Sequence, residues 1–184
     1  SISYRAKEDG SLYVNEWFDK YYHYGENGIA SSGVQEIDGK LYVFEESGHM
    51  YTYEAVAVEG GECYYCDGDG IATKMQNNEW FQTSIGYLYV KDGVVLKNCV
   101  EKIGDNWYGF MFDGRRYTDE EFSAYDKETG KNNFYRAKED GTLCVNEWYN
   151  WYSDRHYYYG NEGKAYSGFQ EVDGMRYYFS ESGE

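Results

Sequence analysis

The stretch Tyr42–Gly48 reads YVFEESG and decides the fold, because its frame, a Tyr followed six residues later by a Gly, runs through the whole chain. The frame occurs at Tyr4/Gly10, Tyr22/Gly28, Tyr42/Gly48, Tyr64/Gly70, Tyr87/Gly93, Tyr108/Gly114, Tyr135/Gly141, Tyr157/Gly163 and Tyr177/Gly183. These nine frames stand about 22 residues apart on average, a spacing typical of repeat proteins. The 184 residues therefore read better as an array of short units than as one ordinary domain.

Each unit has the pattern of a β-hairpin. Alternating residues lead through the Tyr, as in KLYVF at 40–44, and predict a strand. A polar turn such as EESG at 45–48 ends on a Gly that tolerates positive φ, and Asp-Gly turns join strands at 38–39 and 173–174. Because one hairpin of about 20 residues is marginal in water, the units must stack. The sequence predicts an all-β solenoid of about nine stacked hairpins.

A second, longer repeat is superimposed on the repeat of about 22 residues. Asn-Glu-Trp followed by an aromatic residue occurs at 15–18, 78–81 and 146–149, and YRAKEDG at 4–10 recurs unchanged at 135–141. The long period is three hairpins, which predicts three hairpins per turn of a single array over 1–184, with super-repeats at about 4–63, 64–134 and 135–184. Stacking of equivalent hairpins would align Trp17, Trp80 and Trp148 along one side of a rod.

The composition narrows the classes of partner. The chain has 24 Tyr and 22 Gly, no Pro, a mean hydropathy of -0.85 and a formal net charge of -16. Such a charge repels nucleic acid and anionic lipid, and no apolar run approaches the ~20 residues that insert in a bilayer. The start at Ser1 without Met and the stop after Gly183 suggest a fragment of a larger protein.

Four cysteines raise the question of a metal or redox site. Cys63-x-x-Cys66 has metal-site spacing, but Cys99 and Cys144 are isolated, and all four stand at repeat positions, three of them at apolar ones. Structural packing is favoured, with a disulfide or metal site as the alternative. Asp67-Gly68-Asp69-Gly70 resembles the start of a calcium loop, yet no Glu follows at the required distance, so a solvated turn is favoured. We predict no metal and no cofactor.

Segments such as GVQEIDGKLYVFEESGHM (33–50) and LCVNEWYN (143–150) resemble the cell-wall-binding repeats of Gram-positive bacteria. This group includes choline-binding repeats, glucan-binding repeats and the repetitive oligopeptide regions of clostridial toxins. The resemblance covers all nine units. It implies a choline-binding-repeat-like superhelix with successive hairpins turned by about 120°. It also implies a secreted or cell-wall-associated, extracellular protein.

In choline-binding members, aromatic residues of neighbouring hairpins form a cage in which ring faces attract a quaternary ammonium group. Carried over to this chain, the resemblance places Trp17 and Tyr21 at the two main positions, with Tyr42 and Met50 closing the cage. No unit carries tryptophans at both positions. The half cages are Val100 with Trp107 and Phe169 with Arg176, while Trp80 is paired with Gly86 and Trp148 with His156. Val34 and Leu41 occupy both positions of the second hairpin class, which should not cage a cation.

The tryptophans of the three Asn-Glu-Trp motifs have two interpretations, as ligand platforms or as packing within the seam between hairpins. The segment Trp151–Tyr159 departs most from the repeat, and insertions in repeat proteins often lie on a binding face. Its flat rings and donors make it the preferred place for a carbohydrate contact, through Trp151, Tyr152, Arg155, His156 and Tyr157.

No residue pattern predicts an enzyme. His23, His49 and His156 stand at non-equivalent repeat positions, and no recognisable Ser, Cys or carboxylate partner accompanies them. The first hypothesis is a non-catalytic module that binds cell-wall polymer or a host glycan, including choline-like groups, through aromatic grooves between hairpins. The second is a rigid spacer or protein-adhesion rod without a small ligand. The sequence indicates no oligomeric state.

Overall fold

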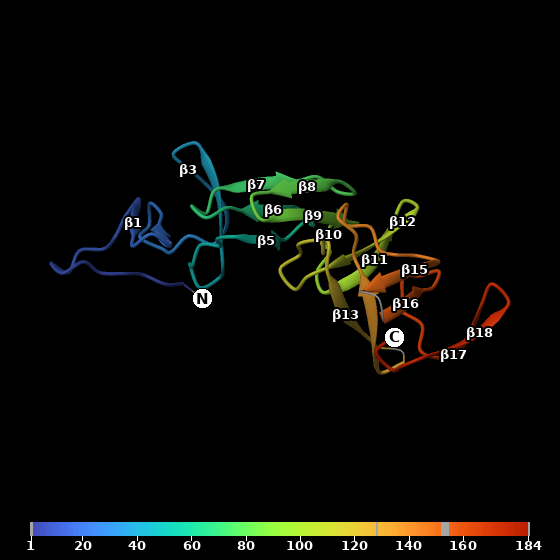
Figure 1. Ribbon diagram of the computed structural model, residues 1–184. Coiled ribbons are helices and arrows are strands. Elements are labelled where there is room, and N and C mark those ends of the chain that lie inside the picture. Colours follow the sequence, from blue (N-terminus) through green and yellow to red (C-terminus); the bar gives the residue numbers. More distant parts are fainter. Residues whose placement is uncertain (1, 128, 152–154, 184) are drawn as a thin grey trace. The chain divides into compact units, whose positions relative to one another are not determined.

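The structure is a computed structural model that describes residues 2–127, 129–151 and 155–183 (Figure 1). Over these residues it consists of antiparallel strands and turns without a helix, which confirms the all-β prediction. It follows that no described helix is long and apolar enough to cross a membrane. The chain divides into two compact units, Ser1–Gln82 with Leu88–Val95, and Thr83–Tyr87 with Leu96–Glu184.

Strands β1 to β8 and β10 lie in the first unit, except that the last residue of β8 belongs to the second, and β9 contributes residues to both units. Their bounds are β1 (Glu16–Phe18), β2 (Tyr22–Tyr24), β3 (Gly33–Ile37), β4 (Lys40–Phe44), β5 (Glu54–Ala57), β6 (Cys63–Cys66), β7 (Ala72–Met75), β8 (Trp80–Thr83), β9 (Gly86–Lys91) and β10 (Val94–Val95). The second unit continues with β11 (Cys99–Ile103), β12 (Asn106–Phe110), β13 (Glu121–Asp126), β14 (Lys131–Arg136), β15 (Glu147–Trp151), β16 (Arg155–Tyr159), β17 (Gly168–Val172) and β18 (Met175–Phe179).

Strands pair with their neighbours in sequence, so each sheet is a hairpin or a three-stranded extension of one. In the β3–β4 hairpin, Gln35 lies opposite Tyr42 and Ile37 opposite Lys40, which leaves Asp38 and Gly39 as the two-residue turn. Both turn residues have positive φ, at 51° and 74°. This is the conformation for which Asp-Gly is selected, and it confirms the hairpin register predicted from the sequence.

Successive hairpins are joined by backbone hydrogen bonds. At several frames, the residue two places after the Gly donates its N–H to a carbonyl of the preceding hairpin, as Met50 does to Tyr21 (2.8 Å) and Ala165 does to Phe134 (2.8 Å). Such steps occur in both units and are the stacking that a hairpin solenoid requires. The super-repeat boundaries, the three hairpins per turn and the alignment of Trp17, Trp80 and Trp148 stay predictions.

The cores lie in the seams between stacked hairpins. They combine the frame tyrosines with small apolar residues, as around Tyr64 in the first unit and Tyr135 in the second. Cys63, Cys66 and Cys144 belong to these clusters, which supports the structural interpretation of the cysteines. Burial raises the pKa of the Cys66 thiol to about 12. Burial also raises the pKa of the Cys63 and Cys144 thiols, so all three thiols stay protonated at neutral pH.

The Asp67 turn also has a structural explanation. Asp67 Oδ1 accepts hydrogen bonds from the backbone N–H groups of Asp69 and Ile71, each at 2.9 Å. The carboxylate thus satisfies its own turn, as Asp does in tight turns generally. Among the described residues, no group of three or more His, Cys, Asp or Glu is placed to hold a metal ion.

Candidate ligand-binding grooves

The Asn-Glu-Trp motif marks the point where the chain passes from one hairpin to the next. Asn15 and Asn146 both have φ of 51°, in the left-handed region where Asn is better tolerated than most side chains. Their N–H groups donate to the carbonyls of Gly25 and Gly160, each at 3.2 Å. The Asn therefore reverses the backbone just before the Trp and directs the next strand along the seam.

The preceding heptapeptide YRAKEDG holds the motif in place by the same contacts in both copies. Lys7 pairs with Glu16 at 2.7 Å, and Lys138 pairs with Glu147 at 2.5 Å. The Arg at the second position lies over the aromatic residue that follows the Trp, Arg5 over Phe18 and Arg136 over Tyr149. The verbatim repetition thus reflects a fixed set of contacts around the Trp.

Trp17 stands in a corner of aromatic side chains in the first unit. Its ring meets His23 edge-on at 5.2 Å and Tyr42 edge-on at 5.1 Å between centroids, with Phe44 at 6.0 Å beneath. Trp17 and Tyr42 are half-buried, whereas Phe44 is fully buried. The structure therefore brings Trp17 and Tyr42 together as predicted, with a shared buried floor.

Trp148 stands in an almost identical corner in the second unit. Its ring lies 5.2 Å from Tyr158, 5.0 Å from Tyr177 and 5.9 Å from Phe179, with interplanar angles of 70°, 67° and 34°. The Trp17 angles to His23, Tyr42 and Phe44 are 62°, 69° and 39°. Trp148 is 37% exposed, so part of its ring is open to a ligand. We call these two clusters the aromatic corners.

The other two residues of the first predicted cage do not join its corner. Tyr21 is exposed and stacks on His49, with centroids 5.4 Å apart. Met50 is 1% exposed, and a Cβ built at Gly70 would collide with its thioether. The expectation that Met50 closes a ligand cage is therefore wrong. The next turn leaves space above Gly70, and Met50 fills that space as packing.

The remaining Asn-Glu-Trp motif, at 78–81, forms a related contact between aromatic rings. Trp80 meets Tyr89 edge-on at 5.0 Å, as Trp148 meets Tyr158. Tyr89 is buried, so this pair places one face of Trp80 against the core of the first unit.

The predicted carbohydrate spot at 151–159 is divided by strand alternation. Trp151 lies opposite Arg155 and Tyr149 opposite Tyr157, on one face of the β15–β16 hairpin. The pair Asn150 and His156 alternates to the other face, where His156 Nδ1 lies 2.7 Å from Asn150 Oδ1. Tyr157 is buried in a core cluster, which removes it from the candidate surface.

Tyr152 lies outside the described residues. Trp151 itself borders a shallow cleft of about 330 Å³ with Asp119, Arg136, Tyr149 and Asn150. The Arg136 guanidinium lies 4.9 Å from the Tyr149 ring centroid and 5.6 Å from that of Trp151, and it pairs with Asp119. The cleft therefore offers a stacked cation and an aromatic edge.

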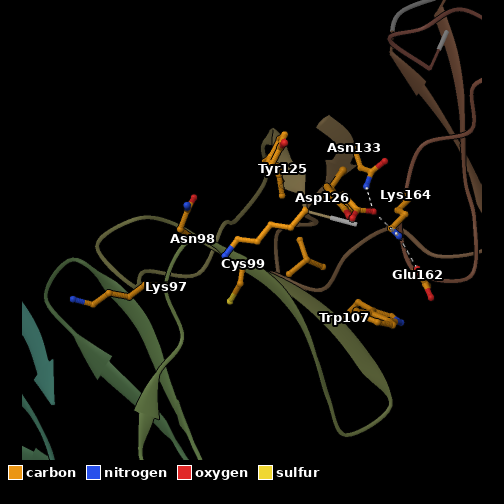
Figure 2. Close-up of a pocket in the computed structure, with 13 residues that line it drawn as sticks. Lys97, Asn98, Cys99, Trp107, Tyr125, Asp126, Asn133, Glu162 and Lys164 are labelled. Atoms are coloured by element: carbon orange, nitrogen blue, oxygen red, sulfur yellow. Dashed lines mark hydrogen bonds and ion pairs between the residues drawn. The ribbon is translucent and has the colours of Figure 1, made fainter. Parts of the chain in front are cut away.

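A larger groove lies beside Trp107 in the second unit (Figure 2). Its volume is about 540 Å³, and its apolar floor consists of Val100, Trp107, Ala124 and Tyr135, around the buried cluster that includes Tyr135. Burial raises the pKa of the Tyr135 hydroxyl, so it stays protonated at neutral pH. A half-buried indole over such a floor is a suitable platform for the apolar face of a sugar ring.

Polar side chains form one wall of this groove. Figure 2 shows Asp126, Asn133 and Lys164 converging. Lys164 Nζ lies 3.0 Å from Glu162 and 3.8 Å from Asp126, while Asn133 Nδ2 donates to Asp126 Oδ2 at 3.4 Å. The hydrogen bond to Glu162 raises the pKa of Lys164, which therefore stays charged at neutral pH. A Trp beside carboxylate, amide and ammonium groups can both stack on and hydrogen-bond to a saccharide.

Sequence reasoning identified Trp107 but missed the groove around it. Lys97, Asp126, Asn133 and Lys164 come from three separate hairpins, and no local pattern links them. Tyr177 in the second corner is different, because it occupies the same frame position as Tyr42 and could have been found by extending the comparison of copies.

Comparison with known proteins supports the repeat interpretation. No protein-family model matches the chain. Glucosyltransferase-S of Streptococcus mutans serotype c is 29% identical over 192 residues, which cover 98% of this chain and 12% of the relative. Glucosyltransferase-I of Streptococcus downei is 24% identical over 184 residues, which cover 96% of this chain and 11% of the relative. The chain therefore spans a small part of the relatives it matches.

Two solved structures show the same fold. Choline-binding protein F, solved in complex with ipratropium, matches with a TM-score of 0.59 at 16% identity over 91% of this chain and 71% of its own. CbpJ from Streptococcus pneumoniae matches with a TM-score of 0.51 at 19% identity over 88% of this chain and 55% of its own. The resemblance to Gram-positive surface repeats is confirmed. The hairpin array has the fold of these repeat proteins.

Proposed function

We propose that this chain is a non-catalytic module that binds cell-wall polymer or a host glycan through aromatic grooves between its hairpins. The observation that carries the proposal is the aromatic corner, which recurs in both units with matching distances and angles around Trp17 and Trp148. A recurring ring surface suits a polymer of repeating sugars, because weak contacts at several sites add up by avidity.

The relatives point to the same class of ligand. Both are glucosyltransferases by name, and the chain matches about a tenth of their length, which leaves ample room for a catalytic part elsewhere. Fold neighbours include a choline-binding protein, so choline-like groups are the second ligand class to test. The corner around Trp148 presents four aromatic side chains, an arrangement that attracts quaternary ammonium groups. An extracellular location follows from either ligand.

In this proposal the module binds and does not catalyse, since a ring surface that recurs in both units suits repeated binding of a polymer. A glycan panel tests it. Intrinsic tryptophan fluorescence should change saturably with α-glucan, peptidoglycan fragments or choline, and Trp148→Ala should weaken the response about tenfold, as expected for loss of a stacking platform. Phe112→Ala is the matched control, because Phe112 is 81% exposed and outside both corners.

A flat response to every ligand in the panel would favour the alternative, a rigid spacer. In that case the corners would serve packing alone, as the full burial of Phe44 and Phe179 already indicates for their floors.

A further inference from the structure

The Trp107 groove differs in charge from the rest of the molecule. Three lysines line it, Lys97, Lys127 and Lys164, against two acidic residues, Asp126 and Glu162. The local balance is therefore one positive charge (three minus two), in a chain whose formal net charge is -16. A local excess of ammonium groups favours an anionic group of a ligand at this position, whereas the net charge of the chain repels anions elsewhere.

The acidic residues of the groove already have partners. Asp126 accepts a hydrogen bond from Asn133 and lies 3.8 Å from Lys164, and Glu162 lies 3.0 Å from the same lysine. Lys127 is exposed and forms no ion pair with any residue that the structure describes. Lys127 is therefore an ammonium group of the groove with which a negative charge on a ligand can pair.

The shape of the groove fits a short saccharide. Its volume of about 540 Å³ lies within the range of roughly 300–1,000 Å³ typical of small-molecule clefts. Trp107 and Tyr135 provide a flat apolar floor, and Asn133 provides an amide on the adjoining wall. A sugar ring on this floor would hold a substituent within reach of the lysine side chains.

We propose that this groove binds an oligosaccharide that carries an anionic group, a carboxylate or a phosphate, with a sugar ring stacked on Trp107 and the anion beside Lys127. This inference rests on the proposed function, because it presumes that the chain binds glycans. It adds that one groove of the array prefers an anionic ligand, whereas the ring faces of the aromatic corners favour neutral or cationic groups.

Isothermal titration calorimetry of the whole chain tests the proposal with three probes of matched length: an oligogalacturonate, a phosphorylated malto-oligosaccharide and a neutral isomalto-oligosaccharide. At low salt the best acidic probe should bind about tenfold more tightly than the neutral one, and the preference should shrink as salt rises, because exposed charges are screened. The two acidic probes distinguish a carboxylate from a phosphate ligand.

Removing a positive or a negative charge from the groove should change the affinity for the acidic probe in opposite directions. Lys127→Gln should weaken binding of the acidic probe about fivefold and leave the neutral probe unchanged, whereas Glu162→Gln should strengthen binding of the acidic probe by releasing Lys164. Lys40→Gln is the matched control, since it removes the same charge at the tip of the β3–β4 hairpin, far along the sequence from the groove. Trp107→Phe keeps a ring over the Tyr135 cluster and should weaken all binding in the groove.

Equal affinity for acidic and neutral probes, or an acidic preference that ignores both salt and Lys127→Gln, would overturn the charge selectivity. If neutral probes still bind and the Trp148 variant still weakens them, the proposed function survives that failure. If no probe binds and the glycan panel is also flat, both proposals fail together.

Discussion

Residues 4–24 of the first unit and residues 135–159 of the second are two copies of one design. Both begin with YRAKEDG, reverse the backbone at an Asn with φ of 51°, and place a Trp in an aromatic corner. They differ at positions that no backbone requirement fixes. Among the differences are His23 against Tyr158, Tyr13 against Cys144, and a second copy that is four residues longer between its Trp and its frame Tyr. Backbone geometry thus holds the frame constant, while the residues around each groove vary.

The largest expected effect comes from the floors of the corners. Phe44 and Phe179 are 2% and 3% exposed, so Phe44→Ala and Phe179→Ala should each lower the free energy of unfolding by about 3 kcal/mol through the cavity that they leave. Urea denaturation measures this, with Phe112→Ala as the exposed control. If one variant is nearly neutral, that corner is not a packed structural element and the two copies are not equivalent.

The next effect tests the left-handed Asn. Asn15→Ala and Asn146→Ala should each cost about 1 kcal/mol in the free energy of unfolding, because Ala disfavours φ of 51° more than Asn does. Asn15→Gly and Asn146→Gly should restore most of the loss, since Gly adopts this conformation readily. Thermal unfolding of the four variants checks the order. Gly variants that are as unstable as the Ala variants would assign the role to the Asn side chain instead.

A smaller effect concerns the pH dependence of stability, which should differ between the two copies because only the first has a His in its aromatic corner. Burial lowers the pKa of His23 below its ordinary 6.5, with Asp38 opposing the shift, so the folded state disfavours the protonated imidazole. Stability from this site is therefore present above about pH 6.5 and is lost as pH falls through the ordinary value toward the lowered one. His23→Tyr, which copies the second corner, should remove this loss of stability.

The measurement is the thermal unfolding of the wild type and His23→Tyr between about pH 7.5 and about pH 5. His156→Gln is the control, because His156 is exposed. An unchanged acid sensitivity in His23→Tyr would show that other groups cause it.

The smallest effect concerns the paired lysines. Hydrogen bonds from Lys7 to Glu16 and from Lys138 to Glu147 raise the pKa of both lysines, so the pairs stabilise at neutral pH and the contribution of each lysine is lost as pH rises through its raised pKa. Lys7→Gln and Lys138→Gln should change the melting temperature only slightly, because exposed pairs are weak. A large loss in one copy that persists at high salt would reveal a packing role for that lysine stem.

The sequence was sufficient for the fold because its signals are local. The Tyr-x5-Gly frame, the Asp38-Gly39 turn and the Asn-Glu-Trp motif each encode a conformation within a few residues, and stacking follows from the need to bury one side of each hairpin. For the same reason, the contact between Trp17 and Tyr42 in the first corner could be predicted, since both residues stand at repeat positions.

The rest depends on contacts that local patterns do not carry. Met50 was expected in a cage, yet the space above Gly70 takes it into the interior. The Trp107 groove joins Lys97, Asp126 and Lys164 from three hairpins, so its charge emerges only after stacking. The segment 151–159 was singled out correctly as unusual, but strand alternation sends Trp151 and His156 to opposite faces.

The joints between hairpins have a mechanical consequence. Within each unit, hairpins are tied to their neighbours by backbone hydrogen bonds such as Met50 to Tyr21 and Leu143 to Trp107, in addition to their own packing. Tension on the ends of the chain would therefore break these joints in succession instead of all at once. Each rupture would release about 22 residues, or roughly 70 Å of extended chain, so the array would lengthen in steps and absorb force while its remaining grooves stay folded.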